Sequence, residues 1–223
     1  ADYQFTESKL LPPEYRSYTE QYWDKKVMAP SCLLYYIGLN KRLTGITHHS
    51  LFFDVDFDQH GKEIYDEPQW PKEPLFYVSA PSVTDHTVAP EGCENLFILC
   101  PVPDLRNKTE WTDASQLADN IISDLSSRVQ FDLHKHTLSK TILTPTDWQN
   151  QFNLYRGSGL GLAHGLNQIG GLRPANKDEE FNNLYYVGAS TVPGTGLPIV
   201  VISSRLVTER IEKEHGAIQQ PVS

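Results

Sequence analysis

The sequence has little cysteine and no long apolar run. Its three cysteines, Cys32, Cys93 and Cys100, form no C-x-x-C pair and lie in apolar surroundings, which favours reduced, buried thiols over a disulfide framework. No uncharged apolar stretch approaches the roughly 20 residues that a membrane-spanning helix needs. The first residues lack both the basic and the apolar stretch of a secretory signal, so we expect a cytoplasmic protein.

Clustered positive charge and metal-binding spacing are also missing. The formal net charge is -9, with 19 basic and 28 acidic residues and no basic patch, which argues against nucleic acid as a partner. The histidine clusters, His48-His49 and His134-x-His136, have no third ligand at a suitable spacing. We therefore expect no metal site, with the first pair starting a strand and the second on a solvated face.

Apolar runs closed by turn residues predict a sheet and several helices. Leu117, Ile121, Leu125 and Val129 recur four apart and predict one buried stripe on a helix that Thr112 or Asp113 caps. The polar N-terminal segment predicts a turn and a short helix. The expected strands are 31–39, 50–55, 75–78, 96–99, 140–143 and 184–187, and the other expected helices are 147–155 and 198–213.

The C-terminal third contains the pattern that points to chemistry. Six glycines fall within residues 157–171, and the run N-L-Y-Y-V-G-A-S-T-V-P-G-T-G-L-P occupies 183–198. Small residues after a strand let a ligand lie against bare backbone, and the following helix N-terminus carries partial positive charge. A plain strand–turn–helix with glycines for packing is the alternative. The predicted binding residues are Gly188, Ala189, Ser190, Pro193, Gly194, Gly196, Leu197 and Pro198.

This run resembles the signature of bacterial-type phytoene desaturases, N-L-Y-x-V-G-A-G-T-H-P-G-x-G-I/L-P. The resemblance extends through L-Y-Y-I-G-L-N at 34–40, A-P-S-V-T-D at 80–85, A-P-E-G at 89–92 and R-P-A-N-K-D at 173–178, in the family's order. One departure is Val192, where the family usually has His, which puts any role of that His in doubt here.

The resemblance implies a mixed α/β (α+β) fold: the C-terminal part of a two-domain, Rossmann-like FAD-binding flavoprotein with an inserted sheet-based substrate domain. Residues 1–26 would leave the FAD domain, 27–146 would form the substrate domain, and 147–223 would complete the FAD site. No G-x-G-x-x-G motif follows a strand, so we expect the dinucleotide half to be missing and the chain alone to be inactive.

The implied reaction is FAD-dependent desaturation of an acyclic C40 polyene such as phytoene, in which FAD takes a hydride, a proton is lost and a conjugated double bond forms. Oxygen or a quinone would reoxidise the FAD, and peripheral membrane attachment would follow from a lipid-borne substrate. Alternatives are hydroxycarotenoid 3,4-desaturases, diapocarotenoid desaturases, ketolases, retinol saturases or a noncatalytic lipid-carrying module. A nicotinamide enzyme is disfavoured.

No catalytic base can be named from the sequence. Asp85 and Glu91 could act as acid or base, but turn chemistry favours a structural role for both. Ser158 lacks a nucleophile elbow, which argues against a hydrolase. Arg173 and Asp178 are expected to hold the loop before the last predicted strand.

Overall fold

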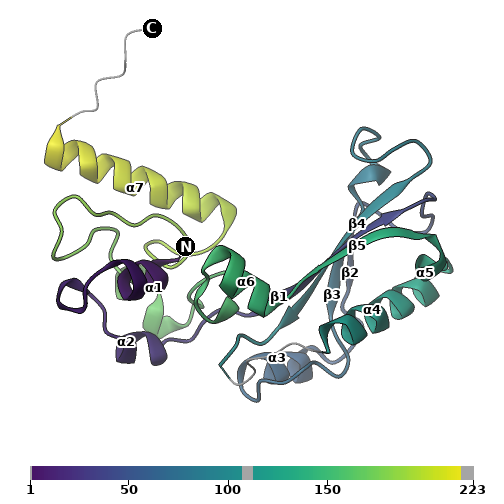
Figure 1. The fold of residues 1–223 in the computed structure, drawn as a ribbon, viewed down its shortest axis with the longest axis horizontal. Coiled ribbons are helices and arrows are strands. Elements are labelled where there is room, and N and C mark those ends of the chain that lie inside the picture. The colour runs from purple at the N-terminus through teal and green to yellow at the C-terminus, as the bar shows by residue number, and fades with distance from the viewer. Residues whose placement is uncertain (1, 107–112, 217–223) are drawn as a thin grey trace, which may run out of the picture. The chain divides into compact units, whose positions relative to one another are not determined.

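The computed structural model describes residues 2–106 and 113–216, which divide into two compact units (Figure 1). One unit joins residues 1–29 to 152–223, and the other comprises 30–151. The expected domain boundaries, after 26 and after 146, lie within a few residues of these divisions. The roles expected of the domains, FAD binding and substrate binding, stay predictions.

The unit 30–151 is built on a five-stranded sheet in the order β2-β3-β4-β1-β5, and every pairing is antiparallel. Its strands lie where apolar runs predict them, although the second ends three residues earlier than expected. The antiparallel sheet beside helices confirms the mixed α/β class. The strands are β1 (Ser31–Leu39), β2 (His49–Phe52), β3 (Phe76–Ser79), β4 (Glu94–Val102) and β5 (Thr137–Leu143).

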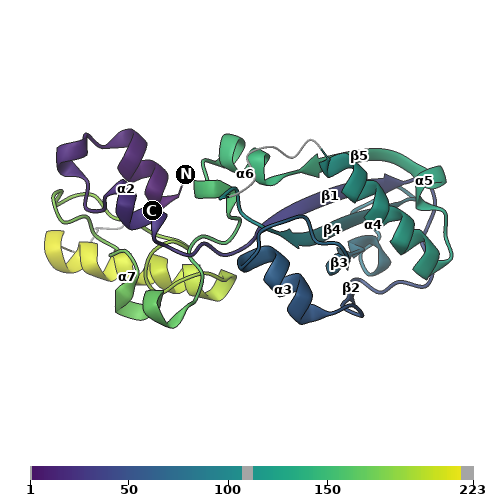
Figure 2. The same ribbon diagram turned by 90° about the horizontal axis from the view of Figure 1, so that it is seen from below.

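One face of this sheet holds the larger hydrophobic core. Alternate residues of β1 and β4, such as Ile37 and Ile98, point into it because successive side chains of a strand point to opposite faces. Helix α4 (Ala114–Val129) contributes Leu117, Ile121 and Leu125 to the same cluster, which confirms the predicted stripe. Figure 2 shows α4 running beside the sheet. Val129 is only partly buried, and the predicted cap Thr112 lies outside the described residues.

Three further helices complete this unit: α3 (Phe57–Tyr65), α5 (Leu133–His136) and α6 (Pro145–Phe152). The sequence patterns did not predict α3, because it is mostly polar and buries only His60, Glu63 and Ile64. The Asp56 carboxylate caps its first turn by accepting a hydrogen bond from the Gln59 amide at 3.0 Å. Turn η3 (Pro81–Val83) follows β3.

The unit formed by both chain ends contains short helical segments, long loops and one long helix, α7 (Leu197–His215). Aromatic residues dominate its core: the rings of Tyr3 and Tyr186 stack with centroids 3.6 Å apart, and Trp23 is fully buried beside them. Its short segments are α1 (Tyr3–Phe5), η1 (Thr6–Leu10), η2 (Pro13–Tyr15), α2 (Glu20–Asp24), η4 (Tyr155–Gly157), η5 (Leu166–Gln168) and η6 (Gly170–Leu172).

The predicted strand 184–187 is wrong as a regular strand. The structure has only an isolated antiparallel bridge between Lys177 and Tyr185. Backbone bonds join Asp178 to Leu184 and Tyr186 to Asn176, so this segment is paired along one edge over a few residues. The apolar run correctly indicated an extended segment. A regular strand needs a longer series of backbone hydrogen bonds than residues 176–178 provide.

Helix α7 buries little of its apolar surface. Ser203 and Val207 are buried, whereas Leu197 is 84% exposed and Val201 is 68% exposed. The expected apolar side is thus only partly covered, since Ile202 is also exposed. Across the described residues, no helix combines the length and apolar character required to span a bilayer.

Candidate functional site

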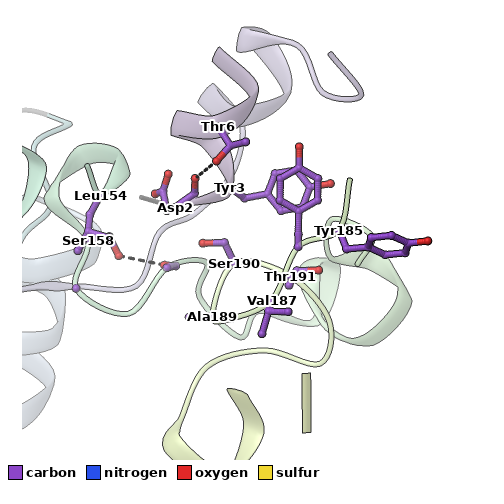
Figure 3. A pocket seen from close by; sticks show the side chains of 14 residues that line it. Asp2, Tyr3, Thr6, Leu154, Ser158, Tyr185, Val187, Ala189, Ser190 and Thr191 are labelled. Carbon is purple, nitrogen blue, oxygen red and sulfur yellow. Dashed lines mark hydrogen bonds between the residues drawn. The ribbon is translucent and has the colours of Figure 1, made fainter. Parts of the chain in front are cut away.

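The unit formed by the chain ends contains a cavity of about 360 Å³ (Figure 3). Three segments line it: the N-terminal residues Asp2, Tyr3 and Thr6, the glycine-containing stretch 154–161, and residues 185–191. Gly188, Ala189 and Ser190, all predicted binding residues, lie in its wall. The structure therefore brings part of the predicted set to a single cavity.

The other predicted residues lie further along the chain and do not line this cavity. Gly194 (φ 143°) and Gly196 (φ 113°) adopt backbone conformations that favour glycine. A Cβ at position 194 would lie 2.6 Å from the Nε2 atom of His164, so that glycine allows a close approach. Pro193, Leu197 and Pro198 connect this turn to α7, and their role in binding stays a prediction.

His164 is a feature that the sequence patterns did not single out. It comes from the glycine-containing segment, yet its imidazole lies against Gly194, two residues after Val192. The chain therefore places a histidine beside the same turn in which the resembling family has one at the position of Val192. Nothing local in the sequence indicates this, because thirty residues separate His164 from Gly194.

The cavity wall depends on close packing between two backbone segments. A Cβ at Gly161 would lie 2.8 Å from the Ser190 hydroxyl oxygen and 3.3 Å from the Ala189 carbonyl carbon. The Ser158 hydroxyl donates to the carbonyls of Ala29 and Gly161, which makes it a structural group. Glycine at 161 therefore lets segment 154–161 lie directly against the loop 187–191.

The Arg173 side chain is hydrogen-bonded to the loop 187–191 and to the segment 162–168. Its guanidinium is buried and makes five hydrogen bonds, all to backbone carbonyl oxygens. Burial lowers the pKa of Arg173, because desolvation disfavours the charged form. Arg173 is a structural residue, but its partners lie in 162–168 and 189–191 and not in the loop before residue 184 that it was expected to hold. The acceptors are Thr191, Ala163, Gln168, Leu162 and Ala189.

Two further side chains tie the loop to α7 and to the preceding segment. The Ser203 hydroxyl donates to the Val192 carbonyl at 2.8 Å and accepts from the Gly188 amide at 3.3 Å. The Asn176 amide group donates to the carbonyls of Tyr186 and Val192. Because these partners converge on residues 186–192, the loop has a defined shape without being part of a sheet.

A buried acidic pair lies behind Tyr186. The Tyr186 hydroxyl donates to Glu7 at 3.0 Å and lies 3.4 Å from Asp178. Burial raises the pKa of the Glu7 carboxyl, and it also raises the pKa of Tyr186. The Asp178 carboxylate accepts hydrogen bonds from the backbone amides of Glu180 and Phe181. This confirms its expected role in holding the loop before residue 184.

The other candidates from the sequence take structural positions. Asp85 accepts hydrogen bonds from the amide and hydroxyl of Thr87, as its predicted turn role requires. His49 begins β2, and His134 is exposed. Within residues 2–106 and 113–216, no group of three or more His, Cys, Asp or Glu side chains is arranged to hold a metal ion.

The cavity suits the ring system of FAD in the kind of atoms that it presents. Its wall from 187 to 191 is formed by small residues, and a Cβ at Gly188 would meet no atom within 4 Å, so this backbone borders open space. The Asp2 carboxylate is already occupied by the amides of Phe5 and Tyr155. The wall leaves room for a flat heterocycle, while the Ala189 and Thr191 carbonyls and the Gly188 amide are already hydrogen-bonded within the protein.

The structure thus defines a two-unit protein, with a cavity lined in part by small residues in one unit and an antiparallel sheet in the other. No protein-family model matches the sequence. Known proteins do: it is 36% identical over 212 residues to a carotenoid 3,4-desaturase of Haloarcula japonica, and 38% identical over 216 residues to a zeta-carotene-forming phytoene desaturase of Myxococcus xanthus. A phytoene desaturase of Fusarium fujikuroi is 32% identical over 237 residues.

These three matches cover 95%, 95% and 97% of the chain, but only 42%, 41% and 41% of the respective relatives. The chain therefore spans about two-fifths of the length of these proteins. The predicted resemblance to the carotenoid-desaturase family is confirmed over almost the whole chain.

Proposed function

We propose that this chain forms part of an FAD-dependent desaturase that acts on a carotenoid polyene, with phytoene as the first substrate to test. The observation that carries the proposal is similarity to named carotenoid and phytoene desaturases over 95% or more of the chain. The backbone-lined cavity supports it, because the residues of the signature run, Gly188 to Ser190, form its wall.

On this proposal Gly188, Ala189 and Ser190 hold the FAD ring system. FAD, when bound, supplies the two-electron acceptor for a desaturation. The chain's own residues shape the binding site: Gly161 allows the wall to close, and Arg173 holds the carbonyls of Ala189 and Thr191. The buried positive charge of Arg173, placed behind the wall, favours negative charge in the cavity.

A further polypeptide segment completes the proposed enzyme. The exposed apolar residues Leu197, Val201 and Ile202 on α7 resemble one side of an interface, since large exposed apolar patches mark interaction sites. The relatives have more than half of their length outside the matched part. We propose that this further segment is the dinucleotide-binding half, because no G-x-G-x-x-G motif follows a strand in the present sequence.

The proposal also includes oxygen or a quinone as the final electron acceptor. It further includes a cytoplasmic location with peripheral membrane contact, because the polyene is carried in lipid.

A hydroxycarotenoid 3,4-desaturase is the second candidate. The Haloarcula japonica relative, named a carotenoid 3,4-desaturase, supports it at 36% identity.

The test is to co-express the chain with the part of the Myxococcus xanthus relative that lies outside the match, and to add phytoene in liposomes without oxygen. We expect bound FAD, bleaching of its absorption and new long-wavelength polyene bands. FAD that is bound but not bleached by phytoene, and bleached by a hydroxylated carotenoid, would favour the second candidate. A co-expressed protein that binds the polyene but holds no FAD would contradict both candidates and favour a lipid-carrying module.

A matched pair of glycine variants locates the site. Gly188→Val places a side chain in the cavity, where we expect FAD binding to weaken by about tenfold or more. Gly170→Val is the control, because a Cβ there also meets no atom within 4 Å and its φ is likewise positive (53°, against 124° at Gly188), so both variants strain the backbone. Equal FAD binding by the two variants would contradict the assignment of the cavity.

A further inference from the structure

Aromatic side chains form a connected series in the core of the unit built from both chain ends, and the series starts at the cavity. Tyr186 and Tyr3 belong to the cavity wall, and their ring centroids are 3.6 Å apart. The centroids of Tyr3 and Trp23 are 5.7 Å apart, and those of Trp23 and Tyr155 are 6.4 Å apart. Rings within about 7 Å of each other interact. These four residues, Tyr186, Tyr3, Trp23 and Tyr155, are here named the aromatic path.

Each end of the aromatic path has a carboxylate that can accept a proton. The Tyr186 hydroxyl donates to the Glu7 carboxylate at 3.0 Å, and the Tyr155 hydroxyl donates to the Asp24 carboxylate at 2.9 Å. A tyrosine that loses an electron becomes a strong acid, so a carboxylate within hydrogen-bond reach takes its proton. Each end can therefore hold a neutral tyrosyl radical.

The two middle rings lack such an acceptor. The Tyr3 hydroxyl and the Trp23 indole nitrogen are buried and have no hydrogen-bond partner among the residues that the structure describes. Burial also raises the pKa of Tyr3, because desolvation disfavours the charged form. These rings can lose an electron only as short-lived radical cations, so the middle of the path transmits charge and does not retain it.

The two carboxylates differ in their access to solvent. Glu7 is 1% exposed, whereas the Asp24 side chain is 64% exposed. A proton transferred to Glu7 stays enclosed beside Tyr186 and returns to it. A proton transferred to Asp24 passes to water, so an oxidised Tyr155 does not easily recover its hydrogen. The path therefore has a direction, from the cavity to Tyr155.

We propose that the aromatic path carries one-electron oxidation from the cavity to Tyr155, an activity separate from hydride transfer. The oxidant is an isoalloxazine ring in the cavity that visible light has raised to its excited state. The path thereby prevents oxidative damage to the cavity wall. The inference rests on the proposed function for the identity of the ring that the cavity holds.

The electrons and protons of this reaction balance. Tyr186 loses one electron to the excited ring, and its phenolic proton moves to Glu7. An electron then moves from Tyr155 through the two middle rings to Tyr186, which recovers its proton from Glu7. Tyr155 releases its own proton to Asp24. The net change is one electron moved from Tyr155 to the isoalloxazine and one proton moved from Tyr155 to Asp24.

The test attaches the oxidant covalently, so that it does not depend on FAD binding. Val187 lines the cavity and is 54% exposed (Figure 3), and Val187→Cys supplies a thiol that a bromoacetyl isoalloxazine alkylates. Cys93→Ser removes a competing thiol. Burial raises the pKa of Cys32 to about 12, and Cys100 is buried, so neither of these thiols reacts readily.

A laser flash starts the reaction in the labelled chain, and transient absorption follows the sharp near-ultraviolet band of a tyrosyl radical. We expect a radical that survives long after the flash. Tyr155→Phe should lose this long-lived signal. Tyr22→Phe is the matched control and should keep it: the Tyr22 ring also contacts Trp23, with centroids 5.3 Å apart, but no carboxylate among the described residues accepts its hydroxyl.

Two further variants test the first step and the middle of the path. Glu7→Gln should slow the appearance of the radical by about tenfold or more, because the remaining carboxylate, Asp178, lies 3.4 Å from the Tyr186 hydroxyl. Trp23→Phe should lose the long-lived signal. Trp23 is fully buried, so thermal unfolding checks this variant, and Tyr155→Phe, which removes only a hydroxyl, decides the matter if it does not fold.

Three results would overturn the inference: no tyrosyl radical in the labelled chain, an equal long-lived signal in Tyr155→Phe, or loss of that signal in Tyr22→Phe. An unchanged rate in Glu7→Gln would overturn the role of Glu7 as the first proton acceptor. None of these measurements involves bound FAD or phytoene, so this inference and the proposed function fail separately.

Discussion

At the scale of single residues, Arg173 supports the loop that forms part of the cavity wall. A buried guanidinium with five carbonyl partners is a rigid connector, since its planar group has five donors in a fixed geometry. It joins residues 162–168 to 189–191, two segments that have no regular secondary structure in common. Together with Asn176 and Ser203, Arg173 therefore fixes the shape of the loop.

We expect Arg173→Lys to destabilise the chain by about 2 to 4 kcal/mol, because lysine has fewer donors and leaves buried carbonyls unpaired. Hydrogen exchange should accelerate most at residues 161–168 and 188–192. Arg205→Lys, whose side chain is 76% exposed on α7, serves as the control. Faster exchange spread evenly over both units would argue against a local positioning role.

Glu7 gives the folded chain a defined pH response. Burial raises the pKa of its carboxyl above the ordinary value of 4.5, so the folded state holds the proton more tightly than the unfolded state. The stability that this group contributes is full below 4.5 and is lost as the pH rises through the raised value. We expect Glu7→Gln to lose less stability over that interval than the wild-type chain.

Urea unfolding at a series of pH values measures this difference. Glu212→Gln, at an exposed position on α7, should follow the wild-type curve. Parallel curves for Glu7→Gln and wild type would show that Glu7 does not carry this pH dependence.

At the scale of elements, the contact between α4 and the sheet holds the unit 30–151 together. Leu125 is completely buried in that contact, together with residues of β1 and β4. We expect Leu125→Ala to destabilise the unit by about 2 to 5 kcal/mol, through lost transfer free energy and the cavity left behind. Chemical denaturation monitored by circular dichroism measures it.

Leu138→Ala tests the specificity of that result. Leu138 belongs to β5 but is 66% exposed, so its truncation should change stability by about 0.5 kcal/mol or less. Equal losses from the two truncations would mean that α4 does not pack as the structure describes.

At the scale of the whole molecule, the proposal that α7 packs against the dinucleotide-binding segment can be tested at its exposed apolar residues. Val201→Lys places a charge on that surface, and we expect it to abolish co-purification with the dinucleotide-binding segment while leaving the thermal unfolding of the chain unchanged. Thr208→Lys, also exposed on α7, adds the same charge further along the helix. Retained co-purification of Val201→Lys would place the partner on another surface.

The amino-acid sequence by itself determined the positions of the five strands, of α4 and of α7, because alternation and helical spacing are local properties of the chain. It also predicted Gly188 to Ser190 as binding residues, and the structure places these three in the wall of a cavity. It missed α3, whose residues are mostly polar, and it predicted a regular strand at 184–187 where a single bridge forms.

Only the tertiary structure decided which residues meet. The five carbonyls around Arg173 come from two separated segments, His164 reaches Gly194 across thirty residues, and β1 lies between β4 and β5 in the sheet. These contacts depend on strand register and on loop closure between distant positions, and no local pattern in the chain encodes either.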